Sequence, residues 1–149
     1  MKRFLITCVL LLMFMFYAQA QSNLSVSVFF EDNYAYAAES RMVWVEGREL
    51  KPYHLKLYRS ISTENKQAVR EMELAVLKDG KEAADKEIGY IGQRLYYAFL
   101  SIKPVVAGST IKRYVFYRNA SLKSKEKKDA TLVYMEGTIS MDELKKMFK

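Results

Sequence analysis

The residue types that most often carry chemistry are sparse in this sequence. His54 is its only histidine and Cys8 its only cysteine. General acid–base catalysis and metal binding usually draw on histidine with a neighbouring carboxylate or a second ligand. His54 stands between Tyr53 and Leu55 and has neither nearby, so we interpret it as a structural residue. The sequence therefore predicts no catalytic constellation, no metal site and no cofactor.

A second set of candidates is formed by acidic residues that alternate with lysines in one stretch of the chain. A glycosidase needs two carboxylates that face each other across a cleft. Alternating charges are more typical of a solvated face. A carboxylate-based hydrolase is therefore less favoured than the two binding functions considered below. The acidic residues concerned are Glu71, Glu73, Asp79, Glu82, Asp85 and Glu87.

Basic residues gather in the segment LKSKEKKD, which contains Lys123, Lys125, Lys127 and Lys128. Together with the aromatic residues of the preceding segment, among them Tyr114, they resemble a surface for single-stranded nucleic acid. The N-terminus has the pattern of an export signal, which argues against nucleic acid and favours an anionic glycan or a lipid headgroup. The other interpretation is a solubilising hairpin loop, because lysines near strand edges also prevent aggregation.

Tyrosines are concentrated in segments with the alternating pattern of strands. Alternation places Tyr97 and Phe99 on one face of a strand and Tyr96 on the other. One face must pack on helices, and the other is expected to be a partly exposed aromatic surface suited to protein or glycan. Strand propensity and core filling explain the tyrosines equally well. Tyr96 and Tyr114, with the four lysines, are our candidate binding surface.

The first twenty residues predict export. Two basic residues at positions 2 and 3 precede an apolar run over 4–17, and AQA at 18–20 has the A-x-A cleavage pattern. The run is shorter than the roughly 18 to 20 residues of a membrane span. We therefore expect a signal peptide over residues 1–20 and a single secreted domain over 21–149, in the periplasm or on the outer cell surface, and not an integral membrane protein after cleavage. Cleavage would remove the cysteine and lower the formal charge of +7 by two, to +5.

The rest of the sequence predicts the elements that hold these residues. Apolar spacing predicts a helix over Glu64–Lys78, capped by Ser62 or Thr63 and ended by Asp79-Gly80. Residues 81–93 fit either a helical turn or a short strand. Alternating apolar residues predict strands in LSVSVFF (24–30), MVWVEG (42–47), YHLKLYRSIS (53–62), RLYYAFLSI (94–102), TIKRYVFYRN (110–119) and TLVYMEG (131–137).

The last residues predict a short helix that begins with a capping box, Ser140-x-x-Glu143. A helix of about nine residues is not stable alone in water, so we expect its apolar stripe to pack on the sheet. A partner-binding helix is the alternative. The stripe consists of Met141, Leu144, Met147 and Phe148.

These elements predict the α+β class. Sequential strands joined by short loops favour antiparallel pairing. We expect a mostly antiparallel sheet of five to seven strands, packed against one central helix and a short C-terminal helix.

Five segments of the chain resemble the small secreted Bacteroidetes domains of unknown function. These are MVWVEGRELKPYHLKLYRSIS, AVREMELAVLKDGKEA, RLYYAFLSI, RYVFYRN and TLVYMEGTISMDELKKM. The resemblance covers most of residues 21–149 and implies a secreted, envelope-associated α+β domain. It implies no particular reaction and no functional residues.

We therefore expect a non-enzymatic envelope protein that binds another protein through an aromatic sheet face or an exposed strand edge. The alternatives are an anionic glycan or lipid headgroup bound by the lysine-rich loop, and the hydrolase.

Overall fold

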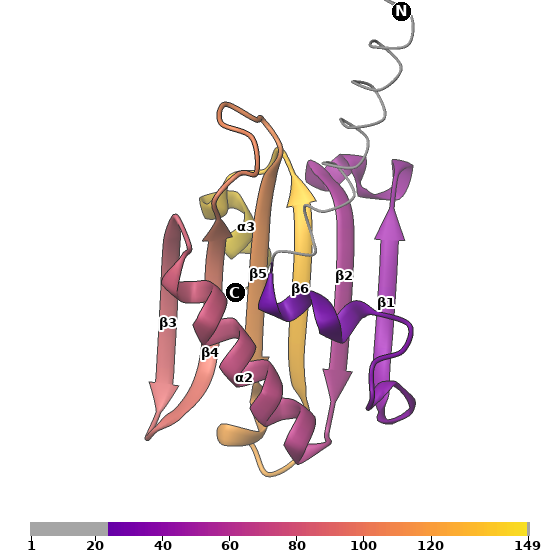
Figure 1. Ribbon diagram of the computed structural model, residues 1–149, viewed down its shortest axis with the longest axis vertical. Helices are drawn as coiled ribbons and strands as arrows, with labels where there is room; N and C mark the ends of the chain where they lie inside the picture. The colour runs from indigo at the N-terminus through magenta and orange to yellow at the C-terminus, as the bar shows by residue number, and fades with distance from the viewer. Residues whose placement is uncertain (1–23, 149) are drawn as a thin grey trace, which may run out of the picture.

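The computed structural model describes residues 24–148, which form a six-stranded antiparallel sheet in the order β1-β2-β6-β5-β4-β3 (Figure 1). The predicted signal peptide lies outside these residues. The strands are β1 (Ser40–Glu46), β2 (Leu55–Thr63), β3 (Asp85–Ile91), β4 (Arg94–Ile102), β5 (Lys112–Asn119) and β6 (Ala130–Gly137).

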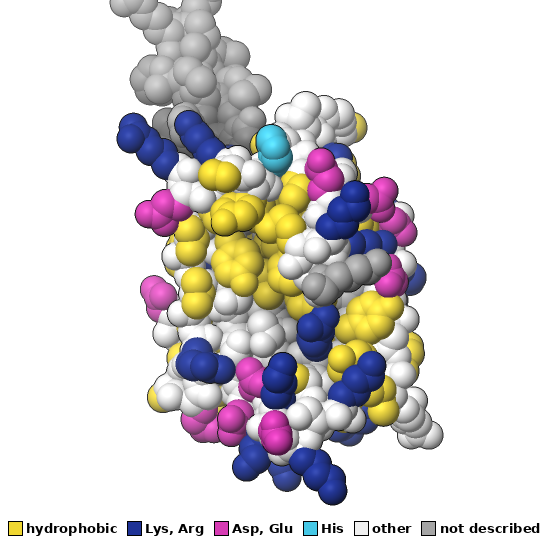
Figure 2. Space-filling view, turned by 180° about the vertical axis from the view of Figure 1, so that it is seen from behind, with side chains coloured by type: hydrophobic (Ala, Val, Ile, Leu, Met, Phe, Trp, Pro, Cys, Tyr) yellow, Lys and Arg dark blue, Asp and Glu magenta, His cyan; other side chains and the backbone are white. Residues whose placement is uncertain are grey.

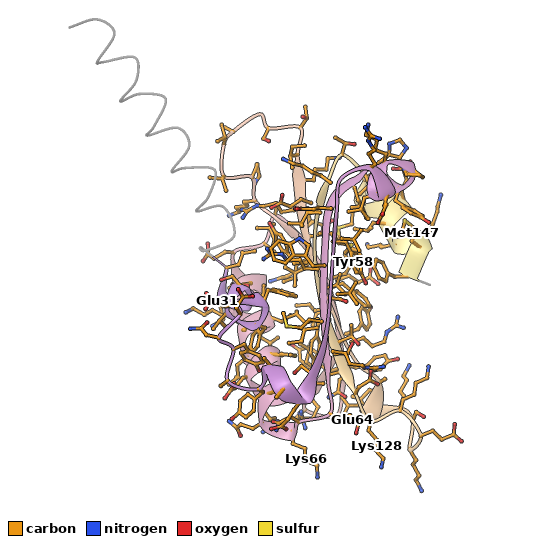
Figure 3. The ribbon with its side chains drawn as sticks, turned by 90° about the vertical axis from the view of Figure 1, so that its right-hand side faces the viewer. Glu31, Tyr58, Glu64, Lys66, Lys128 and Met147 are labelled. Carbon is orange, nitrogen blue, oxygen red and sulfur yellow. The ribbon has the colours of Figure 1, made fainter. Side chains whose placement is uncertain are left out.

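Helices cover both faces of the sheet. Helix α2 (Lys66–Lys81) and the 3₁₀ helix η1 (Ser25–Phe30) lie on one face, and α3 (Met141–Phe148) lies on the other (Figures 1 and 3). Shorter 3₁₀ helices are η2 (Ala37–Glu39), η3 (Arg48–Tyr53) and η4 (Ala120–Leu122). The predicted α+β class and its antiparallel sheet are confirmed. Within residues 24–148, no helix combines the length and the hydropathy needed to cross a membrane.

The strand predicted over residues 24–30 is wrong, because this segment forms η1. Its buried residues are Val26, Phe29 and Phe30. This spacing also fits a 3₁₀ helix, which has three residues per turn. The Asp79 carboxylate accepts hydrogen bonds from the backbone N–H groups of Ser25 at 2.8 Å and Val26 at 3.1 Å. It satisfies N–H groups that have no partner inside the helix.

Both predicted ends of the central helix need correction. Ser62 and Thr63 do not cap α2, because both belong to β2 and pair with β6. Asn65 is the cap, and its Oδ1 accepts from the Ala68 N–H at 2.9 Å. The helix also continues through Asp79 and Gly80 to Lys81, and the uncertain segment 81–93 contains strand β3.

Two hydrophobic clusters lie on opposite faces of the sheet. The larger one joins α2 and η1 to apolar residues of β2, β4, β5 and β6, and it includes Met72, Val76, Leu100 and Leu132. The smaller one joins α3 and η3 to the other face, and it includes Leu144, Phe99, Phe116 and Met135. Strands β4, β5 and β6 therefore contribute side chains to both clusters.

The predicted capping box and the docking of the last helix are both confirmed. The Ser140 hydroxyl accepts from the Glu143 N–H, and the Glu143 carboxylate accepts from the Ser140 N–H, each at 3.2 Å. Leu144 is fully buried. The Phe148 ring stacks on Phe116 at 4.7 Å between centroids, so α3 packs on the sheet as an internal latch.

We expect Leu144→Ala to lower the free energy of unfolding by about 2–5 kcal/mol, because it leaves a cavity under α3. Met147→Ala is the matched control, since Met147 lies on the same helix but is 48% exposed. Urea denaturation of both variants measures the difference. If Leu144→Ala were as stable as the control, α3 would not be docked in solution.

Candidate functional site

Tyr114 does not lie on a surface, and its place in the candidate binding surface is wrong. Its side chain is 1% exposed, and its hydroxyl donates a hydrogen bond to the Ile139 carbonyl at 2.8 Å. Strand β5 lies between β4 and β6, and the chain leading into α3 covers this face. Burial raises the pKa of the Tyr114 phenol, and the Glu143 carboxylate adds to that effect.

The four lysines of the β5–β6 connection do not form one patch. The Lys123 ammonium lies 4.4 Å from the centroid of the half-buried Tyr96 ring, a cation–π contact. Lys125 and Lys127 are exposed, whereas Lys128 lines a cleft beside α2. The structure thus brings Tyr96 and Lys123 together and places Lys128 elsewhere.

Two of the acidic residues behind the hydrolase hypothesis are buried and serve the fold. Asp79 binds the start of η1, and Glu73 binds the start of β4. The Glu73 carboxylate accepts from the Leu95 N–H at 3.1 Å and pairs with the Arg94 guanidinium at 2.9 Å. Within residues 24–148, no group of three or more His, Cys, Asp or Glu side chains is placed to hold a metal ion.

His54 contributes to the fold through its backbone. It ends η3 in the left-handed region with φ 56°, and its carbonyl accepts from the N–H groups of Thr138 at 2.9 Å and Ile139 at 3.2 Å. A side chain at Gly137 would collide with that carbonyl, so glycine permits the close approach. The imidazole itself is exposed.

The face that carries α3 also carries an open apolar surface (Figure 2). A groove of about 230 Å³ runs between η3, β2, β6 and α3. The groove was not predicted from the sequence, because no helix was expected at η3. The available signal is the segment RELKPY, in which Leu50 and Pro52 are apolar residues among polar ones. The groove is lined by Leu50, Tyr53, Leu55, Tyr58, Met135, Met147 and Phe148.

Strand β1 forms one edge of the sheet and exposes large apolar side chains. Met42, Val43 and Trp44 are 45%, 49% and 57% exposed. The Gly47 N–H donates to the Lys56 carbonyl in β2. Alternation in an antiparallel pair therefore directs the backbone N–H and C=O groups of residues 40, 42, 44 and 46 away from β2.

The opposite edge, β3, is protected. It begins with Asp85, Lys86 and Glu87, and its register with β4 shifts at Gly89. Glu87 pairs with Lys145 of α3 at 2.8 Å. Charges, irregular register and short regular length are the usual protection of an edge strand against pairing. Strand β1 has no proline and no register shift against β2, and its charges stand only near its ends, at Arg41 and Glu46.

A family model described as "Family of unknown function (DUF6108)" matches residues 13–148 of the chain. No curated protein and no solved structure matches the chain.

Tyr34 illustrates the electrostatics of the tyrosine-rich core. Burial, with the nearby Glu71 carboxylate and Tyr36, raises the pKa of its phenol from 10.0 to about 12. Its buried hydroxyl has no hydrogen-bond partner among the described residues. Folding therefore favours the neutral phenol of Tyr34. The stability that this preference contributes to the folded protein is complete below pH about 10 and is lost as the pH rises toward 12.

We expect Tyr34→Phe to unfold at the same or higher urea concentration than the unchanged protein at pH 8, because it removes an unpaired buried hydroxyl. Its stability should also fall less steeply than that of the unchanged protein between pH about 10 and about 11. Tyr53→Phe is the control, since Tyr53 is half exposed. A slope unchanged by Tyr34→Phe would mean that this phenol does not contribute to the alkaline loss.

Proposed function

Because the chain belongs to the DUF6108 family, whose function is unknown, we propose its function from its own surfaces. It is a non-enzymatic, secreted envelope protein of Bacteroidetes that binds another protein. The partner contributes an extended segment, which adds to the sheet along β1.

The sequence supports the export part of this proposal. The basic residues, apolar run and A-x-A pattern of residues 1–20 are typical of a signal peptide, and the cysteine falls within that segment. The resemblance to small secreted Bacteroidetes domains points the same way. The periplasm and the outer cell surface are both consistent with these observations.

The unprotected edge of β1 is the observation that carries the binding proposal. An exposed, regular edge with apolar side chains is prone to pair with any other chain, and natural proteins usually block it. Among residues 24–148, one edge of the sheet is blocked at β3 and the other is open at β1. Addition of a partner strand to such an edge is a common mode of peptide recognition.

The side chains of β1 indicate what the partner segment looks like. The ring of Trp44 is held against the Arg59 guanidinium, which lies 3.5 Å from the ring centroid, so Trp44 is fixed before binding. On the other face, Val45 packs beside Tyr58, next to the apolar groove. A fitting segment has apolar side chains on both faces, and one of them is placed to reach the groove.

A photo-crosslinking amino acid at position 43, introduced into the full chain in intact cells, tests this proposal. We expect it to crosslink to one envelope protein through an extended segment that peptide mapping identifies. The same crosslinker at position 90 is the matched control, since Tyr90 lies on the blocked edge strand β3 and is 55% exposed. It should capture nothing specific.

A double variant, Met42→Lys with Val43→Lys, is tested with the crosslinking amino acid moved to position 44. We expect it to reduce the crosslink by about tenfold or more, because lysines oppose strand pairing. Tyr90→Lys should leave it unchanged. Equal crosslinking from both edges, insensitivity to the lysines, or capture of a second copy of this chain alone would each overturn the proposal. Circular dichroism checks that the variants are folded.

A further inference from the structure

A second surface lies at the other end of the molecule, on the α2 side of the sheet. A cleft of about 560 Å³ opens where α2 begins, between this helix and the connection from β5 to β6. Figure 3 shows Glu64, Lys66 and Lys128 at this end of the molecule. The cleft is lined by Glu64, Lys66, Val69, Arg70, Arg94, Asn119, Ser121 and Lys128.

The charge of the cleft is unbalanced. Four cationic side chains line it against one carboxylate, that of Glu64. Arg94 is paired with Glu73, but Lys66, Arg70 and Lys128 make no ion pair with any carboxylate of residues 24–148. Like charges gathered in a concave site raise the local potential and attract an anion.

Two uncharged residues of the cleft, Asn119 and Ser121, are held by hydrogen bonds to each other. Asn119 is 2% exposed, and its Oδ1 accepts from the Ser121 N–H at 3.2 Å. The same Oδ1 also accepts from the Ser121 hydroxyl, so these bonds fix Asn119 and Ser121 at the wall of the cleft. The positive end of the α2 dipole lies at the same cleft.

We propose that this cleft binds a phosphate or sulfate ester carried by a larger polar ligand. Guanidinium groups bind such oxyanions with two parallel hydrogen bonds, and lysines add point charges. The volume lies within the roughly 300–1,000 Å³ typical of small-molecule sites, so a sugar-sized group fits beside the ester.

This proposal is independent of the partner strand. The cleft contains no residue of β1 and none of the apolar groove. It also moves the predicted anion site away from the lysine-rich loop, since only Lys128 of the four lysines takes part. Either binding event can therefore fail without affecting the other.

Isothermal titration calorimetry with three probes tests the cleft. These are inorganic phosphate, a sulfated oligosaccharide, and phosphatidylglycerol vesicles. We expect at least one to bind saturably and with lower affinity at higher salt. Binding of phosphate alone identifies a small ester, whereas binding restricted to the oligosaccharide or to the vesicles identifies a glycan or a lipid headgroup as the source.

Matched variants distinguish the cleft from the general positive charge of the chain. Lys66→Gln with Arg70→Gln should weaken binding by about tenfold or more, because it removes two of the ligand's cationic partners. Lys125→Gln with Lys127→Gln removes the same charge outside the cleft and should change affinity by less than about twofold. Equal losses in both pairs, or no saturable binding of any probe, would overturn the proposal. All four side chains are exposed, so melting curves should be unchanged.

Discussion

The structure depends on the apolar character of both faces of β4, β5 and β6. Side chains such as Leu100 and Leu132 point to one face, and Phe99 and Phe116 point to the other, so each face needs its own cover. Helix α2 and η1 form a broad layer on the first face. The eight-residue α3 forms a narrow layer on the second and leaves the β1–β2 side of that face open. The apolar groove that lies beside the proposed partner strand is thus at the border of the cover that α3 gives to this second face.

The structural features that were predicted correctly from the sequence are those that interactions between neighbouring residues determine. The capping box at Ser140 and Glu143 needs only residues three apart, and the alternation of the sheet strands needs only their own side chains. The segment LSVSVFF was misread because its apolar residues fit both a strand and a 3₁₀ helix. The choice between them depends on Asp79, which lies more than fifty residues away in the chain. The burial of Tyr114 likewise depends on where a distant helix docks.

The candidate sites were harder to predict because topology assembles them. The cationic cleft takes residues from the start of α2, the start of β4, the end of β5, η4 and the loop before β6. Only Lys128 stood in a recognisable basic run. Strand β1 was predicted as a strand, but its position at an edge follows from the pairing of β2 with β6, which no local pattern encodes. The buried role of Glu73 has the same origin, since its partners belong to β4.

The pairing of β2 with β6 also sets the order in which the protein can fold. Thr63 pairs with Ala130, so the two strands cannot meet until every residue between them has left the ribosome. Until then the β1–β2 hairpin has two open edges rather than one, and contacts of such long sequence separation form slowly. A nascent chain therefore passes through a stage in which both edges of this hairpin can pair with another chain. Chaperones that hold extended chains would act on this stage.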